Sequence, residues 1–323
     1  MDSAFKRFFK RFNPKGQNLT SKRIYVAAFG KHPGWDDHID DIGFDTDVFV
    51  SVKRILYVQG IGGNVDSGSW DKLIENQLVE EFKHNFFWYL DGSLIVGRLW
   101  SSQDGKGRKS YPFVVCVQCW NLPIQWVFTN VLPQLEKIEG SCTATTSAND
   151  VRMAVQNAKQ ELRQLAQQCE ASTSSIVAYP DALAKLAEHP EMGPNREGLL
   201  RVLYHIEREV GRYRANSASS MALRSTSLRI PVSQDNMLEN VLLWNSFLFT
   251  MFGRNIPVLI LIPLIGNWID IIIGEPTALQ LYCLRASLKV IPLTSSIPYN
   301  ISSEFIDQAN KLIQGRHSRK FSI

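Results

Sequence analysis

The dipeptide Asp91–Gly92 constrains the fold more than any other feature, because it separates two apolar runs at residues 85–90 and 93–100. Asp-Gly favours a tight turn between antiparallel strands, since both residues tolerate the positive φ that such a turn needs. A third apolar run, residues 111–118, follows a polar loop at 101–110. The sequence therefore predicts an antiparallel sheet built on this hairpin.

Helical periodicity surrounds these strands. Ser147 and Asp150 form a capping-box pattern at the start of a long helix, residues 149–168. A glycine-rich connection is predicted between two earlier helices, 45–57 and 70–82. The other predicted elements are helices at 123–135, 180–188, 196–214, 238–252, 277–286 and 302–314, and strands at 24–29, 228–232, 258–262 and 268–273.

This alternation predicts an α/β protein with mainly antiparallel pairing in each of two halves. Residues 1–21 are expected to form a basic amphipathic extension and linker. Residues 22–170 form a first α/β domain with an antiparallel sheet flanked by helices, and residues 171–323 a C-terminal α/β domain.

Charge and cysteine usage exclude several classes of protein. The net charge of +4 over 323 residues is too small and too dispersed to indicate nucleic-acid binding. The odd number of cysteines, five, favours free thiols in a reducing compartment, and Cys116 and Cys119 are expected to be buried thiols on opposite faces of a strand. The apolar stretch 256–266 is too short to span a membrane, and the charged start is unlike a secretory signal, so a cytoplasmic location is expected.

The first twelve residues, MDSAFKRFFKRF, have a basic amphipathic pattern. Such a segment suits an anionic membrane surface or the groove of a partner protein, although a frayed tail without function has the same composition. The residues predicted to dock are Phe5, Phe8, Phe9 and Phe12.

An acidic stretch, FGKHPGWDDHIDD at residues 29–41, follows the first predicted strand. His32, Asp36, Asp37 and His38 offer metal-ligand types, so a metal-dependent hydrolase is one alternative. Adjacent aspartates in a loop more often satisfy backbone N–H groups of the next turn. Trp35 is either a core anchor or an exposed recognition residue.

A second charged set extends from the end of a strand into the polar loop, and it includes Arg98, Asp104 and Arg108. Arg108 is long enough to pair bidentately with Asp36 or Asp37 if the two loops meet. That pairing would produce a rigid polar ridge that supports a docking face and catalyses no reaction.

These two loops resemble the signatures of TagF/ImpM, an accessory family associated with type VI secretion. Asp36 and His38 stand where the family usually has a glycine and an aromatic residue, and one extra residue follows Arg108. The matching positions are Gly30, Lys31, Pro33 and Asp37 in the first motif, and Asp104, Gly107, Arg108, Tyr111 and Pro112 in the second.

The resemblance implies that residues 22–170 form a longin-like domain that acts as a non-catalytic regulator without a cofactor. It implies contact with a forkhead-associated scaffold protein or with membrane-complex subunits, in the cytoplasm or at the inner-membrane surface. Because longin-like domains often bind GTPases, regulation of a small GTPase is a further alternative.

Overall fold

The computed structural model describes residues 21–169, 182–216, 225–233, 235–252 and 256–314. The predicted docking residues Phe5, Phe8, Phe9 and Phe12 lie outside these ranges.

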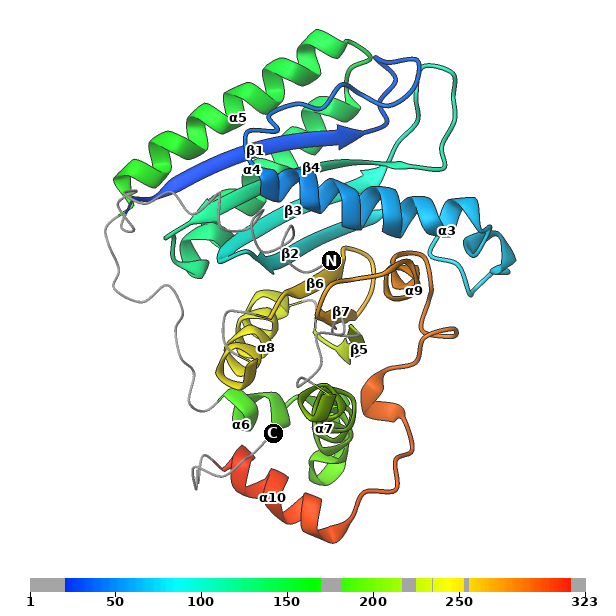
Figure 1. The fold of residues 1–323 in the computed structure, drawn as a ribbon, viewed down its shortest axis with the longest axis vertical. Coiled ribbons are helices and arrows are strands. Elements are labelled where there is room, and N and C mark those ends of the chain that lie inside the picture. The colour runs from blue at the N-terminus through cyan, green and yellow to red at the C-terminus, as the bar shows by residue number, and fades with distance from the viewer. Residues whose placement is uncertain (1–20, 170–181, 217–224, 234, 253–255, 315–323) are drawn as a thin grey trace, which may run out of the picture.

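Within the described residues, seven antiparallel strands form one sheet (Figure 1). The predicted hairpin is confirmed, since Asp91 and Gly92 have φ values of 49° and 73° and join two paired strands. In spatial order the strands are β1 (Arg23–Gly30), β4 (Pro112–Trp120), β3 (Ser93–Ser101), β2 (Lys83–Leu90), β6 (Val258–Pro263), β7 (Trp268–Ile273) and β5 (Thr226–Pro231).

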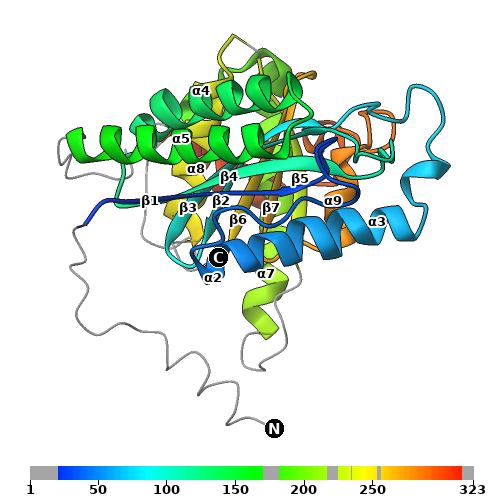
Figure 2. The same cartoon turned by 90° about the horizontal axis from the view of Figure 1, so that it is seen from above.

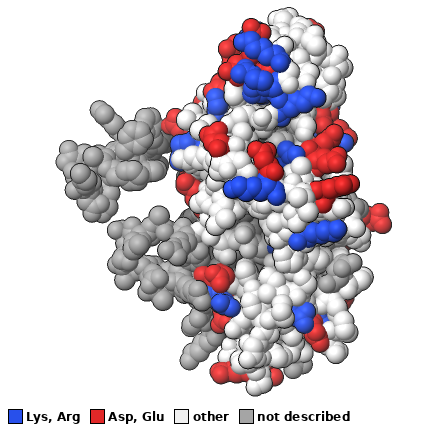
Figure 3. All heavy atoms as spheres, turned by 90° about the vertical axis from the view of Figure 1, so that its right-hand side faces the viewer, with Lys and Arg blue, Asp and Glu red and all other residues white. Residues whose placement is uncertain are grey.

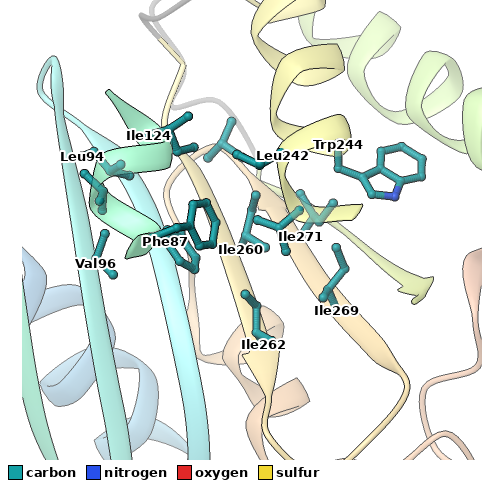
Figure 4. Packing of buried hydrophobic residues seen from close by; sticks show 14 of the residues in the cluster. Phe87, Leu94, Val96, Ile124, Leu242, Trp244, Ile260, Ile262, Ile269 and Ile271 are labelled. Atoms are coloured by element: carbon teal, nitrogen blue, oxygen red, sulfur yellow. The ribbon is translucent and has the colours of Figure 1, made fainter. Parts of the chain in front are cut away.

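The sheet is continuous across the two predicted halves, because β2 pairs with β6 and places Phe87 opposite Ile260. Figure 4 shows these two residues in one apolar layer with Ile271 of β7 and Leu242 of a helix beyond the predicted boundary. The halves therefore share a sheet and a core. The predicted boundary at 170/171 falls outside the described residues.

Helices cover both faces of the sheet (Figure 2). The α/β class with an antiparallel sheet flanked by helices is thus confirmed. One face packs against α4 (Ile124–Thr143), α5 (Ala148–Gln168) and α8 (Met237–Phe252), with α6 (Ala182–Ala187), α7 (Glu197–Asn216) and α10 (Ser303–Ile313) beyond them. The other face packs against α2 (Asp47–Val52), the π-helix η1 (Lys53–Gly62), α3 (Gly63–Asp66) and α9 (Ala278–Leu281).

Strand alternation places side chains three positions apart on opposite faces. Cys116 packs in the core beneath η1, and Cys119 packs in the core beneath α4 and α5. Burial raises the pKa of both thiols. The interpretation of these cysteines as buried thiols is therefore confirmed.

The predicted glycine-rich connection is wrong, because the helix continues through it. Gly60 lies against the buried side chain of Leu281, and a Cβ at position 60 would come within 2.1 Å of Leu281 Cδ1. Asn64 Nδ2 donates to the carbonyl oxygens of Gly60 and Ala278 at 2.9 and 2.7 Å. This close contact with α9 outweighs the low helix propensity of the glycines.

The helix predicted at 70–82 is also wrong. Only a single 3-10 turn forms there, at Trp70–Lys72. The chain then extends along the segment after α9, where the N–H of Val79 donates to the carbonyl of Arg285 at 2.7 Å. The helix predicted at 277–286 is likewise shorter, since α9 ends at Leu281 in another 3-10 turn, Tyr282–Leu284.

A buried ion pair between β5 and β7 holds the segment that follows α9. Arg229 Nε and Nη2 contact Asp270 Oδ1 and Oδ2 at 2.7 and 2.8 Å, and Arg229 is 1% exposed. The three remaining N–H groups of the guanidinium donate to the carbonyl oxygens of Cys283, Ala286 and Ile291. All five donors of Arg229 are therefore satisfied.

We expect Arg229→Met to lower the free energy of unfolding by about 3–5 kcal/mol, because it leaves the Asp270 carboxylate buried without its partner. Arg229→Met/Asp270→Leu should recover much of this loss. Urea denaturation followed by circular dichroism measures both. Arg54→Met is the matched control, since Arg54 is half-exposed and its ion pair with Glu275 is long, at 3.9 Å. This variant should change the free energy of unfolding by less than about 1 kcal/mol. Equal effects of the two single variants would contradict the anchoring role of Arg229.

Gly60→Ala should destabilise the protein by about 1–3 kcal/mol, because its methyl group would displace Leu281 from a packed position. Gly140→Ala is the control: position 140 lies in α4 with no atom within 4 Å of the added Cβ, so a gain of up to about 1 kcal/mol is expected. Thermal unfolding of the two variants tests the packing of Gly60 against Leu281. A Gly60→Ala protein as stable as the wild type would refute it.

Candidate functional site

The acidic loop, defined here as residues 31–46, begins at the end of β1 and returns along the free edge of that strand. Ala28 and Ile42 exchange two backbone hydrogen bonds, at 2.9 and 3.0 Å. Gly43 has a φ of +71° and lies so close to the carbonyl of Val26 that a Cβ would come within 2.1 Å of its oxygen. The loop therefore covers part of an edge that would otherwise present unpaired backbone groups.

Asp104 lies at the centre of the basic loop, defined here as residues 102–111. Its carboxylate is fully buried and accepts hydrogen bonds from Lys31 Nζ at 2.6 Å and from Arg108 Nε at 2.7 Å. It also accepts the backbone N–H groups of Lys106 and Arg108, each at 3.0 Å. Gly107, with a φ of +78°, completes the turn. A single carboxylate thus holds both the loop and a lysine from the acidic loop.

The pKa of Asp104 reflects these contacts. Burial by itself raises the pKa of the carboxyl, but the hydrogen bonds from Lys31, Arg108 and Lys106 outweigh burial and lower it below the ordinary value. Asp104 is therefore ionised at neutral pH and serves as a structural anion rather than a general base.

Arg108 connects the two loops from the surface. Its Nη2 donates to the backbone carbonyl of Asp36 at 2.9 Å and contacts Asp37 Oδ1 at 3.1 Å. The predicted meeting of the loops is thus confirmed. The predicted bidentate pair is wrong, because the guanidinium divides its donors among Asp104, Asp37 and a carbonyl, while the side chain of Asp36 stays exposed.

Gly30, Lys31 and Pro112 hold the base of the ridge, which is the surface that the acidic and basic loops form together. Gly30 has a φ of +118°, and a Cβ there would lie 2.3 Å from the carbonyl oxygen of Pro112. The N–H of Lys31 donates to that oxygen at 3.2 Å. The Nζ of Lys31 is 3.4 Å from Asp37, and the residue is 4% exposed. A buried lysine therefore links both loops to the end of the sheet.

The two histidines have different environments. His32 is buried, donates from Nε2 to the carbonyl of Cys142 at 2.9 Å and accepts the N–H of Gly34 at Nδ1 at 3.0 Å. His38 is exposed and lies 3.1 Å from Asp37, with its ring against Tyr57 and Tyr111. Burial lowers the pKa of His38, and the charge of Asp37 acts in the opposite sense.

Among the described residues, no three His, Cys, Asp or Glu side chains are grouped so that they could hold a metal ion. Because His32 uses both ring nitrogens elsewhere, the predicted four-residue ligand set is not assembled. The geometry gives the alternative of a metal-dependent hydrolase no support.

Trp35 anchors the acidic loop to α5. Its ring is partly buried against the core, and the guanidinium of Arg152 lies 5.1 Å from the ring centroid. Trp35 Nε1 donates to Asp40 at 3.2 Å, and Asp40 pairs with Arg152 at 2.7 Å. This geometry corresponds to the core-anchor interpretation, with the indole N–H satisfied at the surface.

Arg98 does not belong to the ridge. It lies within β3 on the face that packs against α4, is 8% exposed, and pairs with Glu139 and Asn85. The prediction that Arg98 belongs to the charged set of the basic loop is wrong, because its side chain lies on the face of β3 that α4 covers and is buried there.

Sequence reasoning missed the cations that hold the outer part of the acidic loop. Asp41 pairs with Lys53 of η1 at 2.6 Å, and Asp45 pairs with Lys159 of α5 at 2.6 Å. These helices lie on opposite faces of the sheet, so the loop braces both helical layers. No local pattern indicates these partners, since they are 12 and 114 positions away.

Figure 3 shows acidic and basic side chains intermixed on the upper part of the face that includes this end of the sheet. The surface carries no extended patch of one sign there. None of the described helices is both long and apolar enough to cross a membrane. Comparison with protein-family models, curated proteins and solved structures finds no match to this chain.

We expect Asp104→Asn to lower the melting temperature at pH 7, because the amide has one acceptor oxygen instead of two, and its NH2 group would face donors on Lys31 and Arg108 or on the backbone. A carboxyl group whose pKa is lower in the folded state than in the unfolded state stabilises the fold fully at a pH above its unfolded-state pKa. This stabilisation is lost as the pH falls towards the folded-state pKa. The difference in melting temperature between the wild type and Asp104→Asn should therefore become smaller below about pH 4.

Thermal unfolding at pH 7, 5 and 3 measures this difference. Asp36→Asn is the control, since the Asp36 carboxylate is exposed and has no ion pair within the described part of the chain. A difference that stays constant down to pH 3 would show that the Asp104 carboxylate charge does not stabilise the fold.

Proposed function

We propose that this protein is a non-catalytic accessory or regulatory component of a type VI secretion assembly and acts through protein–protein contacts. The observation that carries the proposal is the network around Asp104, which joins the two loops of the TagF/ImpM-like motifs into one ridge. Residues far apart in the sequence thus build one surface, as a contact site requires.

The chemistry of the ridge supports contact rather than catalysis. Two buried ionisable groups, Lys31 and Asp104, neutralise each other, and the buried His32 uses both ring nitrogens in hydrogen bonds. Catalytic sites instead keep a base or nucleophile available to the substrate. The groups that remain at the surface, Asp36, His38 and Lys106, suit the polar rim of a protein interface.

The proposed partners are a forkhead-associated scaffold protein or subunits of the secretion membrane complex. The proposed location is the cytoplasm, with peripheral attachment at the inner membrane through Phe5, Phe8, Phe9 and Phe12. The amphipathic pattern of that segment supports this attachment, since apolar and basic side chains together favour anionic lipid surfaces.

Biolayer interferometry between the full chain and the forkhead-associated scaffold from the same genome tests the proposal. We expect micromolar or tighter binding. Asp36→Arg and Lys106→Glu should weaken it by about tenfold, through lost charge complementarity. Glu304→Lys is the matched control, because Glu304 is an exposed residue of α10, and Figure 1 shows α10 at the opposite end of the molecule from β1. Absence of binding to the scaffold and to each membrane-complex subunit at micromolar concentration would refute the proposal.

A further inference from the structure

A cavity of about 510 Å³ lies beside the ridge, at the end of the sheet. Its walls are the end of β3, the segment before β2, the C-terminal end of α4 and the first residues of the acidic loop. The volume falls within the range of about 300–1,000 Å³ that is typical of ligand pockets. His32, Pro33 and Lys109 contribute to it, so the motif loops form part of the cavity.

The floor of the cavity is apolar and rigid. Trp100 is 4% exposed, and its ring stacks on Phe113 with centroids 4.8 Å apart. The ring of His32 lies edge-on to the same phenylalanine, and both of its nitrogens are already hydrogen-bonded. Cys142 completes this part of the lining. The floor therefore suits an apolar side chain.

The rim carries both signs of charge. In the described part of the chain, the side chains of Glu81, Lys109, Ser102 and Gln103 have no hydrogen-bond or ion-pair partner. Arg285 differs, since its guanidinium donates to backbone carbonyls of Val79 and Glu80 and forms a fixed wall. Free rim groups thus include an anion, a cation, a hydroxyl and an amide.

We infer that this cavity binds a short peptide segment of a partner protein, with an apolar side chain on Trp100 flanked by one basic and one acidic residue. The inference rests on the proposed function as a contact protein and names the chemistry of the contact. Glu81 would pair with the basic residue and Lys109 with the acidic one, while Ser102 and Gln103 meet backbone amides.

The charge balance favours a peptide over other ligands. A phosphate-bearing ligand would meet the carboxylates of Glu80 and Glu81, and a purely cationic ligand would meet Lys109 and Arg285. A peptide of mixed charge satisfies both sides, and its amide groups match the neutral polar side chains of the rim.

The test uses the full chain and three blocked tripeptides: acetyl-Lys-Leu-Glu-amide, acetyl-Lys-Leu-Lys-amide and acetyl-Glu-Leu-Glu-amide. Two-dimensional NMR titration, with the tryptophan indole signals as reporter, measures binding up to millimolar peptide. We expect the mixed-charge peptide to bind most tightly. Glu81→Lys and Lys109→Glu should each weaken it by about fivefold, since each reverses one exposed charge pair.

The charge-reversal variants also test selectivity. Glu81→Lys should bind acetyl-Glu-Leu-Glu-amide better than the wild type does, and Lys109→Glu should bind acetyl-Lys-Leu-Lys-amide better. Glu136→Lys is the matched control, because this exposed residue of α4 is not part of the cavity lining. Equal binding of all three peptides, or no shift of any signal, would overturn the inference.

The outcome is separable from that of the proposed function. If Glu81→Lys and Lys109→Glu leave scaffold binding unchanged, the cavity is not the contact site, and the secretion proposal still stands. If the cavity binds the mixed-charge peptide but no secretion protein binds the chain, the secretion proposal is refuted and the cavity remains a peptide site.

Discussion

The buried carboxylate of Asp104 is the interaction on which the loop end of this molecule depends. An isolated charge at that depth would be strongly unfavourable, so the carboxylate requires Lys31, Arg108 and two backbone N–H groups around it. Satisfying it determines the shape of the basic loop and joins that loop to the end of β1. The acidic loop then follows the edge of β1, where further ion pairs connect it to helices on both faces of the sheet.

A second buried charge pair has the corresponding role near the opposite edge of the sheet from β1. Arg229 and Asp270 lie in β5 and β7, and the remaining donors of Arg229 hold the carbonyl groups of the segment after α9. The helix α9, which precedes that segment, packs against the glycine-containing helix η1. Both pairs connect elements that are distant in sequence. Removing one partner would lower the free energy of unfolding by more than the intact pair contributes to it, because the other charge would stay buried and unpaired.

These constraints bear on the proposed function. A ridge whose charges neutralise one another presents a fixed shape at the surface, which reduces the ordering cost of binding a partner. The neighbouring cavity adds an apolar floor and unpaired polar groups at its rim. The proposed contact thus combines a rigid polar edge with a recess for one side chain, an arrangement in which a few central residues contribute most of the binding free energy.

The sequence by itself determined what depends on near neighbours. Local backbone preferences and strand alternation account for the Asp91–Gly92 turn, the Ser147 cap of α5 and the opposite faces of Cys116 and Cys119. The two motif loops also contained the charged residues that join them in the structure. Only the tertiary structure decided the rest. Gly60 is helical because α9 packs against it, Arg98 is buried because a helix covers it, and β2 joins β6 across the predicted boundary. Each of these depends on contacts between distant segments, whose free energy exceeds the small differences in local propensity from which sequence predictions are made.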